Sequence, residues 1–255
     1  MRKDPVGTRA WVEATGGILR PEERLSFIGQ WLISGMQELP AELLGRMGWK
    51  GSDLVSPAPA EPTVTQGAIE RADAECSQMV PAFLQDHSHR SYLWAMLLAA
   101  HDRIPTAEID EELLYVCCLL HDLGLSRTHP SLVGEKCFTM VGARVLREIA
   151  TDAGWEEDRI RRGEEAITLH VNPRVITGQG LEAHLLTKAT QLDAIGIGTW
   201  RVSPENQREV FAQYRRSHDQ KGGFSALLSF SHHVPGSRAR TYRYLGSRWW
   251  FYFAR

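Results

Sequence analysis

The chain has 255 residues, 43% of them hydrophobic, and a formal net charge of -2. This length suits one large domain or a domain with an extension, and the near-neutral balance lacks the basic field that binds nucleic acid. The longest apolar runs, such as 93–100, are too short to cross a bilayer, and the N-terminus lacks the apolar core of a signal peptide. We therefore expect a globular protein that neither binds nucleic acid nor spans a membrane.

The first 66 residues are predicted to be an N-terminal extension and linker. Within them, residues 21–39 predict an amphipathic helix, because Pro21 suits a first helical turn and apolar residues recur at helical spacing. These apolar residues are Leu25, Ile28, Leu32, Met36 and Leu39. The stretch 49–67 is rich in Pro, Ser and Gly and has no apolar periodicity, which predicts a linker or an arm that lies over the body.

Residues 67–255 are predicted to form one all-α domain with an aromatic C-terminal tail. The predicted helices span 67–80, 88–102, 107–123, 133–154, 156–171, 180–198, 204–217 and 223–232. No alternating strand pattern of convincing length precedes the C-terminus, and residues 240–255 (RTYRYLGSRWWFYFAR) suit a short hairpin or an irregular tail.

Cysteine usage indicates the redox compartment. The cysteines form no C-x-x-C pair, and two of them are neighbours in an apolar segment. They are Cys76, Cys117, Cys118 and Cys137. We expect reduced, buried thiols in a cytoplasmic protein.

Five residues of metal-binding type lie in segments that otherwise predict apolar helices. They are His87, His121, Asp122, His170 and Asp193. The pair His121–Asp122 follows the apolar run LLYVCCLL, where polar groups are costly unless they have partners. Imidazole and carboxylate together are a common ligand set for a divalent metal, so the sequence predicts a metal in a helical core and a metal-activated water.

The spacing of the pair restricts how it can bind. Neighbouring residues on a helix point about 100° apart, so His121 and Asp122 can reach one ion only near the helix end, where Gly124 follows. With His87 and Asp193 they make two imidazoles and two carboxylates. This set suits zinc first, or iron, manganese or nickel, with open positions for water.

A further cation lies beside the first histidine. Arg90 follows His87 by three residues and so lies on nearly the same helix face. We expect it to orient Asp122 or Asp193, or alternatively to contact substrate.

The ordered motifs resemble the HD-domain superfamily of metal-dependent hydrolases, and within it the cyanamide hydratase-like branch. The matching pieces are DHSHRSYLWAMLLA (86–99), ELLYVCCLLHDLGL (112–125), the GA dipeptide in FTMVGARVL (138–146), AITLH (166–170), QLDAIG (191–196) and GGF (222–224). The resemblance covers roughly residues 67–230 and implies a helical HD bundle with an N-terminal helical extension.

The resemblance also implies residue roles and an activity. It makes His87, His121, Asp122 and Asp193 the metal ligands, with Asp122 also a proton acceptor. It places His170 near the metal, where it would contact substrate or a second ion. The implied activity is the addition of water to a small polar substrate, such as a nitrile-type carbon that is hydrated to a urea or an amide.

The sequence departs from the family pattern at two positions. Many phosphohydrolases of the superfamily have a lysine at the position of Leu125, and members of the branch often have an acidic residue at the position of Thr139. The first departure weakens a phosphate-cleaving function, because that lysine is a natural partner for phosphate.

Other functions stay open from the sequence. A metal-dependent phosphohydrolase acting on nucleotides or phosphomonoesters could use Arg127 and Lys136 as phosphate partners. A di-iron oxygenase of the same superfamily could use His170 and His184. A non-catalytic partner protein that retains the fold is a third alternative. The amphipathic N-terminal segment and the aromatic C-terminus also leave a homo-oligomer open.

Overall fold

The computed structural model describes residues 4–46, 62, 67–125, 137–216, 234–242 and 244–245. Its α-helices are α1 (Arg9–Thr15), α2 (Pro21–Arg46), α3 (Ala68–Met79), α4 (Ala82–His101), α5 (Glu111–Leu120), α6 (Thr139–Asp152), α7 (Glu157–Leu169), α8 (Leu181–Ile195) and α9 (Pro204–Gln213). Short 3-10 helices are η1 (Thr106–Glu108), η2 (Leu123–Leu125), η3 (Thr177–Gln179) and η4 (Thr199–Arg201). Among the described residues, the β-type backbone pairing consists of one isolated antiparallel bridge between Ile18 and Ser237. The predicted all-α class is confirmed.

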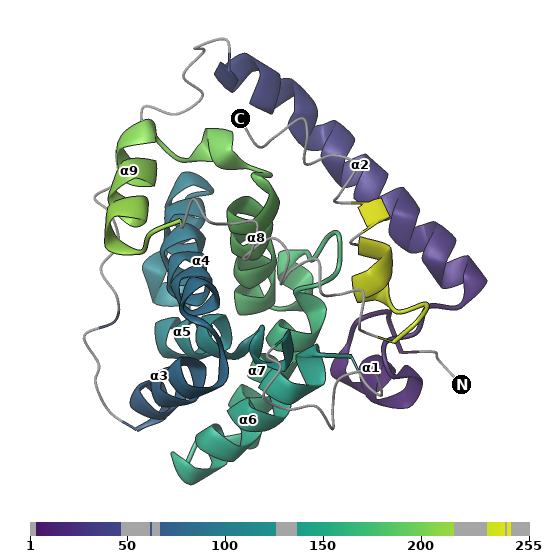
Figure 1. The fold of residues 1–255 in the computed structure, drawn as a ribbon, viewed down its shortest axis with the longest axis vertical. Coiled ribbons are helices and arrows are strands. Elements are labelled where there is room, and N and C mark those ends of the chain that lie inside the picture. The colour runs from purple at the N-terminus through teal and green to yellow at the C-terminus, as the bar shows by residue number, and fades with distance from the viewer. Residues whose placement is uncertain are drawn as a thin grey trace.

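The helices α4, α5 and α8 form the centre of the bundle. Helix α4 packs against α8 and α5, α6 packs against α7, and α3 lies beside α5 (Figure 1). Helix α5 is buried from Leu113 to Leu120, and α4 buries a long run of residues that includes Trp94. Helices that are apolar on every side must be surrounded by protein, so these two helices form the core that carries the predicted site residues.

Several helix boundaries differ from the prediction. Helix α5 begins at Glu111 and not at 107, α6 begins at Thr139 and not at 133, α8 ends at Ile195 and not at 198, and α9 ends at Gln213 and not at 217.

Two further differences bear on the site. Helix α4 begins at Ala82, six residues before the predicted start, because Pro81 precedes it in an extended conformation and the Gln85 side chain bonds to the carbonyls of Ser77 and Val80. His87 therefore lies inside a helix and not at its start. Helix α5 ends at Leu120, before the predicted 123, and the chain tightens into η2. The predicted helix 223–232 lies outside the described residues.

The N-terminal region contains a helix that the sequence analysis missed. Thr8 caps α1 by accepting a hydrogen bond from the Trp11 N–H, and Gly16 ends the helix in the left-handed conformation with φ of 64°. Trp11 and Val12 are buried in the same hydrophobic cluster as α4 and α5. The proposed domain boundary at residue 66 stays a prediction.

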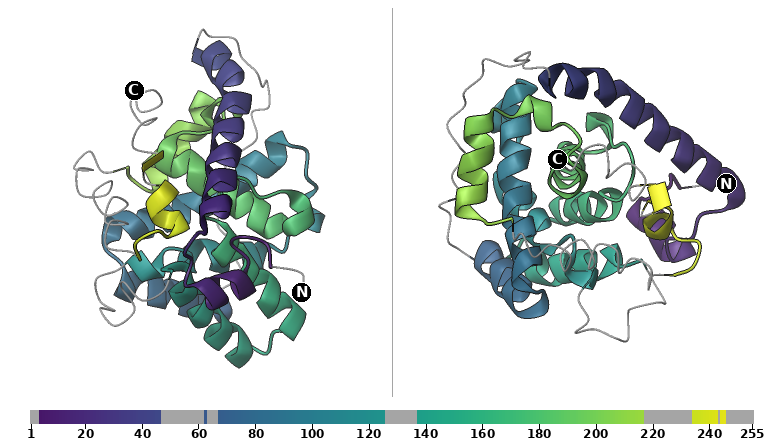
Figure 2. Two further views of the ribbon diagram at one scale, coloured as in Figure 1. Left: turned by 90° about the vertical axis from the view of Figure 1, so that its right-hand side faces the viewer. Right: turned by 45° about the horizontal axis from the view of Figure 1, so that its top comes forward.

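Helix α2 lies along the outside of the bundle (Figures 1 and 2). Phe27 and Trp31 are its large buried side chains. Of the predicted apolar stripe, Leu25, Leu32 and Met36 are exposed, Leu25 at 73% and Met36 at 67%, whereas Ile28 and Leu39 are half-buried. Its second half is held by Glu38, which accepts two hydrogen bonds of 2.7 Å from Arg201 in η4. The helix is present as predicted, but it buries a different face.

The segment 234–242 returns to the N-terminal region. The amide of Arg238 donates to the carbonyl of Gly17 at 3.0 Å, and the amide of Leu19 donates to the carbonyl of Gly236 at 3.2 Å. Figures 1 and 2 show this segment in yellow beside α1 and α2. Most of the predicted aromatic tail, 246–255, lies outside the described residues.

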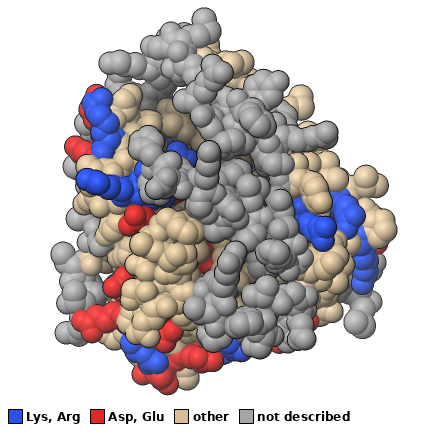
Figure 3. All heavy atoms as spheres, in the orientation of Figure 1, with Lys and Arg blue, Asp and Glu red and all other residues tan. Residues whose placement is uncertain are grey.

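The surface has mixed charge on the side seen in Figure 3. Basic and acidic side chains of described residues lie near one another along its lower edge. Within the described part of the chain, no helix combines the length and the apolar character needed to span a membrane. All four cysteines are buried and unpaired, as predicted.

Candidate metal centre

The ends of several core helices bring the five predicted metal-type residues together. His87 comes from α4, His121 is the C-terminal cap of α5, and Asp122 follows it. His170 is the C-terminal cap of α7, and Asp193 lies in the last turn of α8. All five side chains are buried. The prediction that the His-Asp pair lies at a helix end is confirmed.

Two glycines allow α6 to approach the end of α5 that carries the pair. A Cβ atom at Gly142 would overlap the carbonyl oxygen of Leu120, and one at Gly124 would overlap that of Phe138. The approach places Phe138 beside the site, with its ring centre 5.6 Å from that of His170. The glycine of the GA dipeptide is therefore needed for close helix packing.

Three of the residues form a compact group with the spacing of metal ligands. The Nε2 atoms of His87 and His121 lie 3.2 Å apart. Oδ2 of Asp122 lies 3.3 Å from Nε2 of His121 and 3.6 Å from Nε2 of His87. The three side chains can each direct one ligand atom to a shared point.

The hydrogen bonds behind the two imidazoles fix which nitrogen carries the proton. Nδ1 of His121 lies 2.7 Å from the carbonyl oxygen of Cys118, which can only accept, so Nδ1 must donate. Nδ1 of His87 lies 2.6 Å from Oδ2 of Asp193 and donates in the same way. In the neutral imidazoles, both Nε2 lone pairs therefore face each other and a carboxylate, an arrangement that either a proton or a metal cation between them would stabilise.

The pKa values of Asp122 and His121 are shifted by the electrostatic interaction of the two side chains with each other. Burial alone would raise the pKa of Asp122, but His121 and His170 hold it well below its ordinary value. Burial alone would lower the pKa of His121, but the Asp122 carboxylate raises it. A proton and a metal cation would therefore compete for Nε2 of His121, and metal affinity should fall with acidification.

His170 lies at the other oxygen of Asp122. Its Nε2 is 3.6 Å from Oδ1 of Asp122, and its Nδ1 lies 2.6 Å from the carbonyl oxygen of Ile167. Burial lowers the pKa of His170, which favours a neutral ring with a free Nε2 lone pair. His170 is therefore beside the three-residue group, with its basic nitrogen directed at the group's carboxylate.

Asp193 is held by several donors. Arg90 donates to both carboxylate oxygens at 2.8 Å, and the Trp94 indole N–H donates to Oδ1 at 2.7 Å. Together with the bond from His87, these contacts hold the pKa of Asp193 far below its ordinary value, although burial opposes this. In this geometry Asp193 orients His87 from behind, and its assignment as a direct ligand stays a prediction.

The position of Arg90 matches one of the two expected roles. It forms a buried, two-pronged ion pair with Asp193, and its Nη1 donates to the carbonyl of Arg215 at 3.0 Å. The sequence analysis did not predict a role for Trp94. The spacing i, i+3 and i+7 was nevertheless visible in the sequence, and it places His87, Arg90 and Trp94 on one face of α4.

The residues invoked for the alternative functions lie elsewhere or outside the described part. Nδ1 of His184 lies 2.6 Å from the carbonyl oxygen of Val175, and His184 is not in the three-residue group. Leu125 is buried in the hydrophobic cluster. Arg127 and Lys136 fall outside the described residues.

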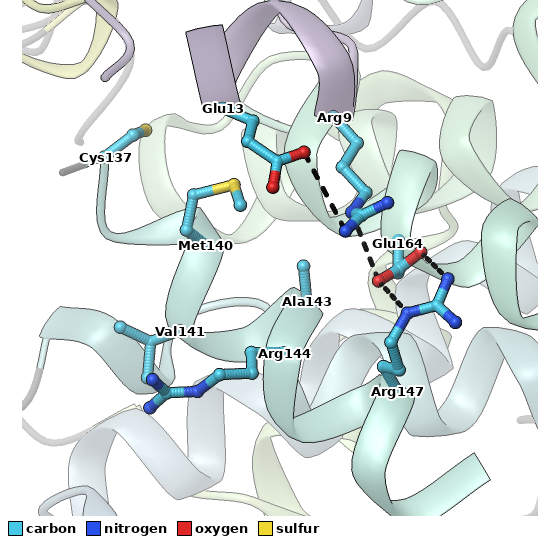
Figure 4. Close-up of a pocket in the computed structure, with 9 residues that line it drawn as sticks. All are labelled: Arg9, Glu13, Cys137, Met140, Val141, Ala143, Arg144, Arg147 and Glu164. Carbon is cyan, nitrogen blue, oxygen red and sulfur yellow. Dashed lines mark hydrogen bonds and ion pairs between the residues drawn. The ribbon is translucent and has the colours of Figure 1, made fainter. Parts of the chain in front are cut away.

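A separate pocket lies between α1 and α6 (Figure 4). It encloses about 230 Å³. The buried Glu164 carboxylate on its wall accepts hydrogen bonds of 2.7 and 2.6 Å from Arg147 and lies 3.2 Å from Nε of Arg9. No residue of the metal cluster lines this pocket, and its ion pairs hold α1 against α6 and α7.

Comparison with known proteins matches the central part of the chain. Residues 84–195 match the model of the HD domain family. Cyanamide hydratase DDI2 and cyanamide hydratase DDI3, both of Saccharomyces cerevisiae, are each 30% identical to the chain over 138 residues. The matched region is 52% of this chain and 59% of each relative, so it spans about three-fifths of their length. The resemblance drawn from the sequence motifs is confirmed.

Proposed function

We propose, from the match of residues 84–195 to the HD domain family, that the protein is a metal-dependent enzyme that adds water to a small polar substrate. One observation carries the proposal. The Nε2 lone pairs of His87 and His121 face each other at 3.2 Å beside the ionised Asp122 carboxylate. A divalent cation would neutralise this arrangement.

The three-residue group would hold the metal, with Asp193 as the proposed fourth residue of the set. When bound, the metal would lower the pKa of a water molecule and supply a nucleophile near neutral pH. Arg90 and Trp94 fix the Asp193 carboxylate, which in turn fixes the ring of His87. This chain of hydrogen bonds keeps Nε2 of His87 directed at the site.

Asp122 and His170 are the proposed catalytic pair. Oδ2 of Asp122 faces the imidazoles, and Oδ1 faces Nε2 of His170 at 3.6 Å. A proton that leaves the attacking water can pass from Asp122 to His170, whose neutral ring is able to accept it. His170 can then return the proton to the substrate atom that gains negative charge.

The proposed substrate class is a small nitrile such as cyanamide, whose hydration would yield a urea or an amide. The names of the two yeast relatives support this class. The buried position of Leu125 argues against phosphate cleavage, because no cation is present at the position where many phosphohydrolases have a lysine. We further propose one zinc ion per chain and a cytoplasmic location, which suits four unpaired thiols.

The experiment that tests the proposal removes the Asp122 carboxylate. Asp122→Ala should lose bound metal and turnover together, because the change removes a ligand atom and the charge that compensates the cation. Metal content by mass spectrometry and hydration of cyanamide and other nitriles would be measured on protein purified without chelator. Asp86→Ala is the matched control, since Asp86 adjoins His87 but lies outside the group.

The outcomes separate the competing functions. A variant with full metal content and full turnover would show that Asp122 is wrongly assigned. One zinc per chain with nitrile hydration supports the proposal. Two irons per chain in the unmodified protein would instead favour the oxygenase, and turnover of nucleoside monophosphates would favour the phosphohydrolase.

A further inference from the structure

Arg238 is a fully buried cation that forms no ion pair with a carboxylate among the described residues. Its side chain is 0% exposed, and its Nε has no hydrogen-bond partner within the part of the chain that the structure describes. A guanidinium group stays protonated in proteins, and burying a charge is costly unless other groups compensate it. The groups that surround Arg238 should therefore reveal why the chain keeps a charge there.

Arg238 binds the chain on both sides of His170. Its Nη2 donates to the carbonyl of Thr168, and its Nη1 donates to Oδ1 of Asn172 at 2.9 Å. Thr168 lies in the last turn of α7, whose unpaired carbonyls form the negative end of the helix. The guanidinium therefore caps the helix that ends in His170. The helix end and the Glu165 carboxylate, whose pKa Arg238 acts to lower, both compensate its charge.

Arg238 also reaches both neighbours of Phe138. Its Nη2 lies 3.4 Å from Oγ1 of Thr139 and 3.8 Å from Sγ of Cys137. The ring of Phe138 packs edge-on against His170. Arg238 thus contacts Thr168 and Asn172, which lie two positions before and after His170. It also contacts Cys137 and Thr139, the direct neighbours of Phe138.

The N-terminal region closes over this arrangement. Nδ2 of the Asn172 side chain donates to the carbonyl of Val6 at 2.8 Å, and a Cβ atom at Gly7 would overlap both Asn172 and Arg238. Gly7 has a φ of +92°, which favours glycine. Two segments outside the HD domain match at 84–195, one near each end of the sequence, therefore meet beside the end of α7.

We propose that Arg238 is a positioning residue for His170, and that the C-terminal segment 234–242 thereby completes the catalytic site of the HD domain. The proposal rests on the function proposed above, because it assumes that the His170 side chain takes part in the reaction beside the metal group. Arg238 contacts none of the three residues of the metal group, so it acts on His170 and not on metal binding.

The test replaces the guanidinium while leaving the metal group intact. Arg238→Met removes the charge and all its hydrogen bonds, and Arg238→Lys keeps a charge that can cap Thr168 but cannot also bridge to Asn172. Arg240→Met is the matched control, from the same segment but only half-buried. Four properties would be measured: metal content, melting temperature, kcat and KM, and the ring nitrogen signals of His170 by NMR, identified by their absence in His170→Gln.

We expect Arg238→Met to retain its metal, to shift the His170 ring signals and to lower kcat about 10- to 100-fold, with a smaller change in KM, because a misplaced catalytic group mainly slows the chemical step. Arg238→Lys should recover part of kcat, and Arg240→Met should match the unmodified protein. If Arg238→Met does not fold, Asn172→Ala removes one acceptor and should shift the same signals.

Two results would overturn or separate the claims. Unchanged His170 signals and unchanged kcat in folded Arg238→Met or Asn172→Ala would overturn the positioning role. Shifted signals in a protein whose unmodified form hydrates no nitrile would support the positioning of His170 while refuting the proposed function.

Discussion

Each imidazole of the candidate site is oriented by an acceptor behind it. Main-chain carbonyls hold the Nδ1 atoms of His121 and His170, and Asp193 holds that of His87. The three bonds are 2.6 to 2.7 Å long, and each leaves an Nε2 lone pair directed inward. At the scale of single residues, the site is thus prepared for a cation before any cation binds.

His170→Ala tests the division between metal binding and catalysis. The variant should keep its metal, because His170 lies outside the three-residue group, and its kcat should fall about 10²- to 10⁴-fold through loss of a proton-transfer group. Metal content and steady-state kinetics would be measured, with His184→Ala as control. Loss of half the bound metal would instead indicate a two-metal site.

The start of helix α5 is fixed by an N-terminal cap, Asp110. Asp110 caps it by accepting a hydrogen bond of 3.1 Å from the Leu113 N–H, and it also accepts two bonds from Arg159 on α7. Burial opposes ionisation, but Arg159 and the cap bond lower the pKa of Asp110. The carboxylate thus sets where α5 begins and ties it to α7. Helix α5 leads to the metal group, and α7 leads to His170 beside it.

Asp110→Ala should lower the free energy of unfolding by about 1–2 kcal/mol at pH 7. Since the folded pKa lies below the unfolded value of about 3.9, this contribution is present above that value and is lost as the pH falls through the folded pKa. The difference between variant and parent in urea unfolding should therefore shrink below about pH 4. Glu108→Ala, at an exposed position nearby, should show neither effect; a pH-independent difference would contradict the ionic explanation.

At the scale of the whole molecule, the outer face of α2 carries apolar side chains that do not pack into the core. Leu25, Leu32 and Met36 are exposed along it at roughly heptad spacing. Coiled-coil pairs use this spacing. A homo-oligomer, which the sequence leaves open, is therefore expected to bury this face.

Replacing Leu25 and Met36 together by Asp should weaken self-association at least tenfold, because each buried side chain of this type contributes about 1.5–3 kcal/mol. The melting temperature of the subunit should change little, since both residues are exposed in the single chain. Light scattering over a range of concentrations measures the effect, with Gln37→Asp as control. A parent protein that is monomeric at every concentration would refute the α2 interface.

Local sequence determined the helical class, the His-Asp pair and the metal-type set. An apolar run that ends in His121–Asp122 is informative by itself, because burial of polar groups requires partners wherever the run packs. The motif order also predicted the HD resemblance. The sequence did not determine every helix start: α4 extends back to Ala82 because the Gln85 side chain donates to two carbonyls at the end of α3.

Only the tertiary structure decided which groups meet. The pairing of Arg90 and Trp94 with Asp193 joins residues about a hundred positions apart, as does that of Arg238 with Cys137. The buried face of α2 also depended on packing, because its sequence offers both Phe27–Trp31 and the Leu25–Leu32–Met36 stripe as apolar faces. The periodicity of a sequence shows that a helix has an apolar face. The free energy of the assembled bundle decides which face is buried, and it also decides which distant donor binds a buried carboxylate.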